Sequence, residues 1–297
     1  MKTILVLTDF SNSARNAAET AVLIAESLNT DILLLNNHSS TSLATQDVKP
    51  VSDSKSFQSS NNADMQKEAV RIEKIISKRK ESNRKHIVNC INTEGLLSAS
   101  VAMVLKKHPI IMIIMGGRIT TNCKSFFGSD IYAVVNKANC PILILPDHKF
   151  DLKIKNLVFV TDLPTKDIKD VKYLVKLSGV FKFNIHLCHI SDQVLIMDLI
   201  EAEDLSGFTS AVAKLNLRSI SFRNLKGSNY VKEVEKFTKS VRADIVAMVH
   251  KKHFLFWRLF NDDHSKKLTT NQNTPYLILP EQWGKWDNPK EGTYCHI

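Results

Sequence analysis

The sequence feature that most restricts the fold is a short apolar run that occurs twice and ends both times in Thr-Asp. Residues 3–9 read Thr-Ile-Leu-Val-Leu-Thr-Asp, and residues 156–162 read Asn-Leu-Val-Phe-Val-Thr-Asp. Such short, continuous, partly β-branched runs are typical of strands that are buried on both faces of a parallel sheet. The recurrence after about half of the chain indicates two copies of one domain rather than a solenoid.

Each copy alternates apolar runs with segments of helical spacing. In the first half we expect strands at residues 3–9, 31–35, 86–91, 109–115 and 141–146, and helices at about 17–25, 64–82, 96–107 and 128–139. In the second half the corresponding strands are expected at 156–162, 183–189, 217–223, 243–249 and 274–280, with a helix at about 228–241. The order predicts two Rossmann-like α/β domains, each a five-stranded parallel sheet with helices on both faces. We expect the two sheets to be separate.

The chain length of 297 residues suits about two domains. We expect domain 1 at residues 1–147, domain 2 at 152–281 and a C-terminal tail at 282–297, with the linker near 147–154. The tail carries two tryptophans and a tyrosine and could pack on domain 1 or mediate dimerisation. Residues 38–62 are rich in Ser, Thr, Asn and Gln, which predicts a long mobile loop.

Composition narrows the class of partner. The formal net charge is +10, but the lysines and arginines are scattered and form no arginine-rich run, which favours a solvated surface over nucleic-acid binding. The five cysteines show no CxxC spacing, which favours reduced thiols and a cytoplasmic location. We expect no membrane anchor, because no apolar stretch reaches the ~18 residues of a spanning helix and the N-terminus does not resemble a signal peptide.

Four segments carry a resemblance to a known family: the strand end at residues 8–11, the run 113–118, the Phe-Phe-Gly-Ser at 126–129 and the closing strand 140–146. Together they resemble the universal stress protein family in its tandem form. The resemblance extends over nearly all of residues 1–280 and implies an adenine-nucleotide α-hydrolase-like fold. In nucleotide-binding members, glycines close around the phosphates, a Gly-Ser begins a helix, and an acidic residue after the first strand lies near the base and ribose. The implied ATP-binding residues here are Asp9, Ser11, Gly116, Gly117, Arg118, Gly128 and Ser129.

This sequence departs from the family pattern. The second glycine of the motif is missing near Arg118, whose positive charge offers a partial substitute. In domain 2, residues 249–263 contain no glycine, and their aromatic residues are more typical of a filled pocket or an interface. We therefore expect no ATP in domain 2, where Asp162 would cap the next helix. The glycines of domain 1 also have a purely structural interpretation, as residues that permit tight strand-to-helix turns.

The sequence gives less support to metal binding or catalysis. His189, His250 and His253, together with the acidic residue at 162, are expected near one sheet edge and suit a transition metal, but their spacing matches no known metal motif. There is no Walker A or nucleophile-elbow pattern, so we expect no enzyme.

The preferred hypothesis is a cytoplasmic stress-response binding protein with a nucleotide in domain 1 and a structural or dimerising domain 2. Two alternatives stay open. One is a dimeric scaffold that associates through domain faces or edge strands without a ligand, and the other is a weak ATP hydrolase.

Overall fold

The computed structural model of the protein describes residues 1–38, 54–79, 86–117, 129–161, 167–191, 199–215, 219–227, 229–250 and 274–281. For residues 54–61, 129 and 199–205 it describes the backbone only. The expected tail at 282–297 therefore lies outside the described residues.

The first domain is a doubly wound parallel sheet. Its elements are β1 (Thr3–Leu7), α1 (Asn12–Leu28), β2 (Asp31–His38), α2 (Ser54–Lys78), β3 (Val88–Glu94), α3 (Leu97–Lys107), β4 (Ile110–Gly116), α4 (Ser129–Val135) and β5 (Ile142–Leu145). The strands lie in the order β3-β2-β1-β4-β5, and all neighbouring pairs are parallel.

The second domain repeats this arrangement. It consists of β6 (Asn156–Val160), α5 (Ile168–Phe181), β7 (Asn184–Ser191), α6 (Leu199–Ala213), β8 (Ile220–Lys226), α7 (Tyr230–Ser240), β9 (Ile245–His250) and β10 (Tyr276–Pro280). Its strand order, β8-β7-β6-β9-β10, is the same as in the first domain, and its neighbouring strands are parallel. The predicted fold class of two five-stranded Rossmann-like domains is confirmed.

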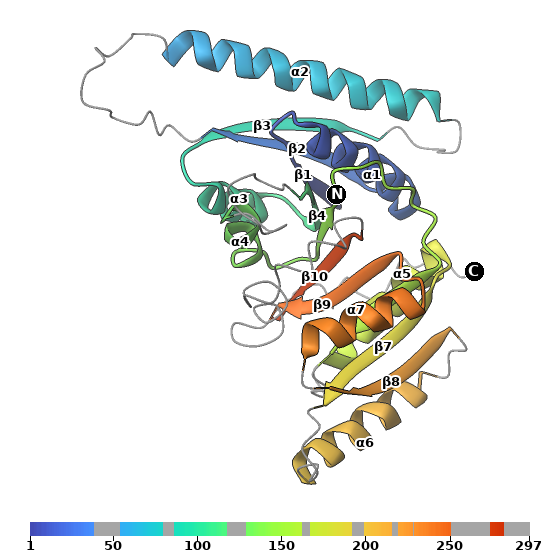
Figure 1. Cartoon of the computed structure of the whole chain (residues 1–297). Helices are drawn as coiled ribbons and strands as arrows, with labels where there is room; N and C mark the ends of the chain where they lie inside the picture. Colours follow the sequence, from blue (N-terminus) through green and yellow to red (C-terminus); the bar gives the residue numbers. More distant parts are fainter. Residues whose placement is uncertain are drawn as a thin grey trace, which may run out of the picture.

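The expectation of two separate sheets is wrong, because β5 and β10 pair antiparallel and join all ten strands into one sheet (Figure 1). Leu143 lies opposite Leu277, and the flanking pairs are Ile142 with Ile278 and Ile144 with Tyr276. Leu143 and Leu277 hold corresponding positions in the two domains, so a pseudo-two-fold axis passes between them. The physical reason for the join is that an unpaired apolar edge strand exposes backbone groups that pairing satisfies. An apolar run does not reveal which strand lies beside it.

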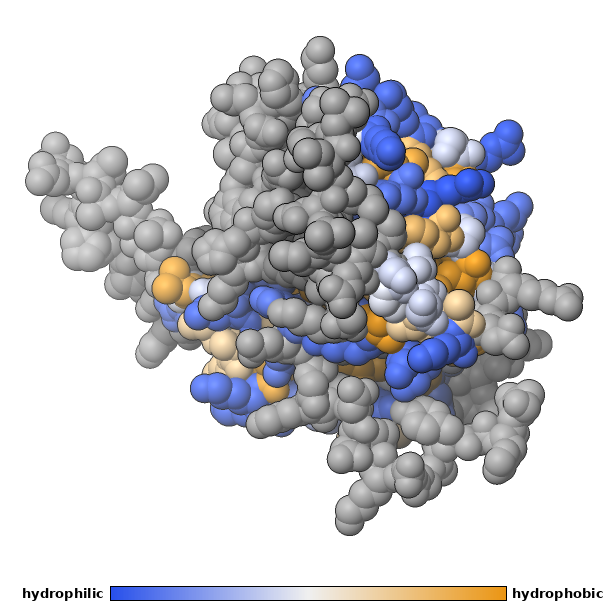
Figure 2. Space-filling model, turned by 90° about the horizontal axis from the view of Figure 1, so that it is seen from below, coloured by the Kyte–Doolittle hydropathy of each residue, from blue (hydrophilic) through white to orange (hydrophobic). Residues whose placement is uncertain are grey.

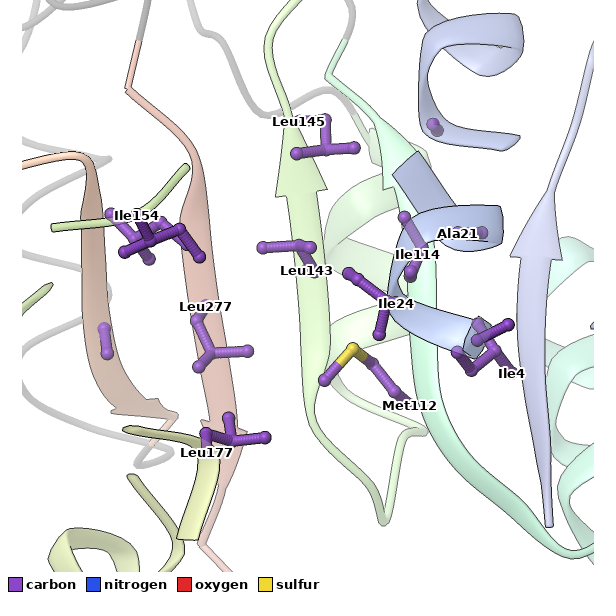
Figure 3. Close-up of a cluster of buried hydrophobic side chains, with 14 of the residues drawn as sticks. Ile4, Ala21, Ile24, Met112, Ile114, Leu143, Leu145, Ile154, Leu177 and Leu277 are labelled. Atoms are coloured by element: carbon purple, nitrogen blue, oxygen red, sulfur yellow. The ribbon is translucent and has the colours of Figure 1, made fainter. Parts of the chain in front are cut away.

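The two faces of the joined sheet carry two cores that extend through both domains. Strand residues alternate between them, so Ile4 faces one core and Leu5 the other. Helices α1, α2, α5 and α6 cover the first face, and α3, α4 and α7 cover the second. In Figure 3, Leu143 of the first domain lies beside Leu277 of the second. The hydrophobic core is therefore shared between the domains.

The expected linker is packed against the protein. Ile154 is buried in the first core, and Phe150 and Leu152 pack against the same core. At its start, the Asn16 side-chain amide of α1 donates a 3.0 Å hydrogen bond to the carbonyl oxygen of Asp147. Alternating apolar residues thus hold this segment along the sheet, in contact with both domains.

Part of the predicted 38–62 loop is helical. Strand β2 extends to His38, and α2 already begins at Ser54. Residues 54–62 lack an apolar stripe, so their sequence shows no helical period. A helix that has formed on the packed face of Met65 and Ile72 can extend through polar residues, because adding a residue to a helix is much easier than nucleating one. Residues 39–53 lie outside the described part of the chain.

Charged groups hold α2 against α1. Arg71 makes two hydrogen bonds to the Glu68 carboxylate, at 2.7 and 2.9 Å, and a third of 2.6 Å to Glu19. The hydrogen bonds that Arg71 donates to Glu68 raise the pKa of the Arg71 guanidinium. Arg79, the residue directly after α2, pairs with Glu26 of α1 at 2.6 Å. These partly buried, multiply bonded pairs fix the orientation of α2 better than isolated surface pairs would.

The surface is mixed in character. Figure 2 shows hydrophilic residues interspersed with smaller hydrophobic areas over the coloured part of the face seen from below. None of the helices among the described residues is both long and apolar enough to cross a membrane.

The junction of the sheets predicts a large loss of stability for Leu277→Ala. Leu277 is 3% exposed at the pseudo-two-fold axis, and truncation of a buried leucine to alanine costs about 2–5 kcal/mol. Urea denaturation followed by circular dichroism measures the change. The control is Val180→Ala in α5, whose side chain is 45% exposed and should change the free energy of unfolding by less than about 0.5 kcal/mol. Equal effects of the two substitutions would contradict the packing described here.

Candidate functional site

The candidate site lies at the carboxyl ends of β1 and β4, which are neighbours in the sheet. The chain leaves β1 into α1 on one face and leaves β4 toward α4 on the other face. Such a point, where the connections of adjacent parallel strands diverge, is where doubly wound sheets form a ligand crevice. This switch point lies between the strand ends that carry Asp9 and Gly116.

Asp9 and Ser11 are brought together at the rim of this crevice. Asp9 is exposed, and its Oδ1 accepts a 3.0 Å hydrogen bond from the Ser11 amide and a 2.5 Å bond from the Ser11 hydroxyl. The same hydroxyl accepts a 3.3 Å bond from the Ala14 amide and so caps α1. The chain reaches this cap through Phe10, whose φ of 63° is in the left-handed region. Hydrogen bonds from the backbone and side chain of Ser11 thus hold the carboxylate in place.

Gly116 has a packing role that the sequence did not reveal. A Cβ atom at this position would lie 2.7 Å from the Ser13 carbonyl carbon and 2.8 Å from the Ser13 Cβ. The first turn of α1 therefore lies directly against the end of β4, and only glycine permits this distance. This contact holds the start of α1, and with it Asp9, close to β4.

The backbone amide of Gly117 is hydrogen-bonded to the neighbouring strand. Gly117 is buried, and its amide donates a 2.7 Å hydrogen bond to the carbonyl oxygen of Leu145. This amide is therefore not available to a phosphate in the arrangement described. Arg118 and Gly128 lie outside the described residues, and for Ser129 only the start of α4 is described.

A polar cluster at the ends of β2 and β3 was missed by the sequence analysis. The Asn36 side-chain amide donates a 2.7 Å hydrogen bond to the carbonyl oxygen of Thr8, directly before Asp9. The neighbouring Asn37 accepts bonds from the hydroxyls of Thr93 and Ser100, at 2.9 and 2.8 Å. The available signal was the pair of asparagines that continues an apolar strand, where polar side chains need partners.

The second domain differs at the corresponding edge. The sheet registers align Gly116 with Val249 and Gly117 with His250, one position away from the sequence alignment, which matched residues 109–115 with 243–249. Helix α1 begins at residue 12, five positions after β1 ends, whereas α5 begins at residue 168, eight positions after β6 ends. In the second domain, where Val249 replaces the glycine, the helix after the first strand thus starts three positions later than in the first domain.

His250 fills space at this edge and links the two domains. It is 8% exposed, and its Nε2 lies 3.1 Å from the Oδ1 of Asn136, the residue that follows α4 of the first domain. A side chain from the first domain thus contacts the edge where the second domain would bind a ligand.

The two histidines of the metal hypothesis that the structure describes lie on opposite faces of the sheet. His189 lies two residues after Leu187 in β7 and therefore shares its face of the sheet, the α5 face. Its Nδ1 donates a 3.0 Å bond to the carbonyl oxygen of Thr161. His250 follows Val249 and faces α4. The described residues contain no group of three or more His, Cys, Asp or Glu suited to a metal, and His253 and Asp162 lie outside them.

The described cysteines are packing residues. Cys140 and Cys188 are buried and free, and burial raises the pKa of each thiol to about 12. Cys90 is half-buried, and its thiol pKa is also raised by burial. These shifts disfavour the reactive thiolate.

Comparisons with known proteins agree with this fold. The model of the universal stress protein family matches residues 1–146. The structure of a universal stress protein from Archaeoglobus fulgidus superposes with a TM-score of 0.68 at 12% identity and covers 94% of this chain and 98% of its own. A putative universal stress protein from Pseudomonas aeruginosa superposes with a TM-score of 0.59, also at 12% identity, over 94% of this chain and 92% of its own. A search of curated proteins finds no match.

The duplicated, doubly wound sheet places the protein in the class of tandem α/β proteins. Proteins with such sheets generally bind their ligands at a switch point. Within that class, residues 1–146 match the model of the universal stress protein family. Its second half repeats the same fold.

The close contact at Gly116 predicts that Gly116→Ala destabilises the protein. The new methyl group must displace the first turn of α1, and overpacking of this kind costs about 1–3 kcal/mol. The matched control is Gly179→Ala inside α5, where an added Cβ has no neighbour within 4 Å. This control should stabilise the protein by about 0.5–1 kcal/mol because alanine favours a helix. Thermal unfolding distinguishes the two, and a neutral Gly116→Ala would show that the contact is unimportant.

Proposed function

We propose that the protein is a stress-response binding protein that binds one adenine nucleotide, such as ATP, in its first domain and catalyses no reaction. The observation that carries the proposal is the exposed Asp9 carboxylate at the β1/β4 switch point, held by Ser11 and by the close contact at Gly116. A carboxylate accepts hydrogen bonds, and the hydroxyl groups of a ribose are suitable donors. The match of residues 1–146 to the universal stress protein family supports the stress-related role.

The phosphates would lie toward β4 and the start of α4. Backbone amides near a glycine-rich turn and a positively charged arginine favour anions, and this is the role we assign to Arg118, Gly128 and Ser129. These three assignments rest on the family resemblance.

We assign the second domain a structural role. Strand β10 completes the joined sheet, and Val249 and His250 replace the two glycines. Because β5 and β10 pair with each other, association with a second copy of the chain must use other surfaces, such as helices or the outer strands β3 and β8. The free thiols of Cys140 and Cys188 support the cytoplasmic location that we propose.

A ligand-independent scaffold is the second candidate. It is favoured by the Gly117 amide, which is already bonded to Leu145, and by the missing second glycine of the motif. In this case both domains would serve only to present surfaces to a partner.

Calorimetric titration with ATP tests the proposal. The wild-type protein should bind one ATP per chain, and Asp9→Ala should weaken binding about tenfold or more, because a hydrogen bond to a charged group contributes about 1.5–3 kcal/mol. The control is Asp151→Ala in the linker, whose side chain is 71% exposed and pairs only with Lys153 in the described structure. Absence of binding at millimolar ATP would favour the scaffold.

A further inference from the structure

We propose that Ser221 of the outer strand β8 is an acyl-acceptor site of the second domain, with His186 of β7 as its base and Asn156 of β6 as the residue that orients the base. The three side chains lie near the amino ends of adjacent parallel strands, whereas the proposed nucleotide site lies at the carboxyl ends of β1 and β4. The protein is the acceptor of the group in this step, so the inference adds a modification site and no catalytic turnover to the proposed function.

A chain of hydrogen bonds connects the three side chains. The Oγ of Ser221 lies 2.8 Å from the Nδ1 of His186, and the Nε2 of the same imidazole lies 3.2 Å from the Oδ1 of Asn156. A hydroxyl, a base within hydrogen-bonding distance and a third group on the far side of the base form the arrangement by which proteins activate a serine as a nucleophile. The three residues come from different strands, so no local sequence motif reveals them.

The neighbouring groups determine which nitrogen of His186 carries the proton. The Oδ1 of Asn156 can only accept hydrogen bonds, and the side-chain amide of Asn184 also donates to it, at 3.4 Å. Nε2 is therefore the protonated nitrogen, and Nδ1 presents its lone pair to the Ser221 hydroxyl. Burial lowers the pKa of the His186 imidazole, which favours the neutral form that can accept a proton.

Asn156 is held in place through its backbone. Its amide donates a 2.9 Å hydrogen bond to the Oδ2 of Asp244, and its carbonyl oxygen accepts a 2.9 Å bond from the Asp244 amide. This double contact between β6 and the residue directly before β9 keeps the orienting group on a rigid part of the sheet. A base that is supported in this way is already in position to take a proton.

The first domain has different residues at the three positions. The strand registers align Asn156, His186 and Ser221 with Thr3, Leu33 and Asn89. Leu33 is 2% exposed and belongs to the second core. In the second domain the same face is accessible to a reagent, because Ser221 is exposed and His186 is half-buried. The second copy has thus exchanged a core leucine for an imidazole with a hydrogen-bonding partner on each side.

Arg223 indicates the class of acyl donor. It lies two positions after Ser221 in β8, on the same face of the sheet and about 7 Å along the strand. Both side chains are exposed. A guanidinium at this distance attracts a negatively charged leaving group, so the favoured donors are acyl phosphates rather than neutral esters.

The transfer is a substitution at the acyl carbon. The Ser221 oxygen forms a bond to this carbon while its proton passes to the Nδ1 of His186. The bond from the carbon to the phosphate oxygen then breaks, and the phosphate leaves with that electron pair and takes the proton from Nδ1. The products are an acyl ester on Ser221 and hydrogen phosphate, with neutral His186 restored and nothing oxidised or reduced.

Incubation of the full chain with acetyl phosphate, followed by peptide mass spectrometry, tests the proposal. We expect acetylation of Ser221, and His186→Leu, which introduces the residue of the first domain, should slow it about a hundredfold or more, because a positioned base contributes at least this factor. Asn156→Asp keeps an acceptor for Nε2 and should retain the labelling, whereas Asn156→Val should lose most of it. The matched control is Ser219→Ala, two residues earlier in the chain, which should leave the labelling of Ser221 unchanged.

The donor class is tested with Arg223→Gln and a second reagent, the neutral ester 4-nitrophenyl acetate. This substitution should slow the reaction of Ser221 with acetyl phosphate about tenfold, the size of one lost interaction with a charged group, and should leave the reaction with the ester unchanged. An unchanged ratio of the two rates would overturn the preference for acyl phosphates.

Labelling of lysines alone, or of Ser221 at the same rate in wild type and folded His186→Leu, would overturn the acceptor site. Circular dichroism shows whether each variant is folded. For a His186→Leu variant that does not fold, the comparison of wild type with its urea-unfolded form decides: faster labelling of Ser221 in the folded chain supports the site, and equal labelling overturns it.

Discussion

The antiparallel pairing of β5 with β10 is the interaction on which the rest of the structure depends. It joins two apolar edge strands, places Leu143 against Leu277 and makes the cores on both faces of the sheet continuous. Because the junction is antiparallel, the carboxyl ends of the strands point to opposite edges of the sheet in the two domains. The crevice of domain 1 and the corresponding edge of domain 2 therefore open in opposite directions.

This geometry explains a contact between the domains that a simple duplication would not suggest. Helix α4 runs from the carboxyl edge of domain 1 to its amino edge, which is the carboxyl edge of domain 2. Asn136, just beyond α4, therefore meets His250 where domain 2 would hold a ligand. The two edges have diverged accordingly: one keeps Gly116 and Asn36, and the other has Val249 and His189. A covalently joined pair can specialise in this way, because the two copies need not have the same sequence.

Much of the fold follows from local patterns in the sequence. Short apolar runs located the strands to within a few residues, and the repeated Thr-Asp ending revealed the duplication. Contacts between residues that are distant in the chain could not be predicted from such local patterns. The need for glycine at 116 arises from Ser13, which is distant in the chain, and the join between β5 and β10 depends on the partner of an edge strand. The hydrogen bond from Asn36 to Thr8 likewise forms only when two strands come together.

The central claim is that the paired strands and shared cores make the two domains one cooperative unit. Differential scanning calorimetry of the full chain tests it most directly, because a two-state transition has equal calorimetric and van't Hoff enthalpies. A single transition with this equality, for the whole chain, is the result predicted here. Two resolved transitions, or a calorimetric enthalpy about twice the van't Hoff value, would show that the domains unfold independently and would contradict the account.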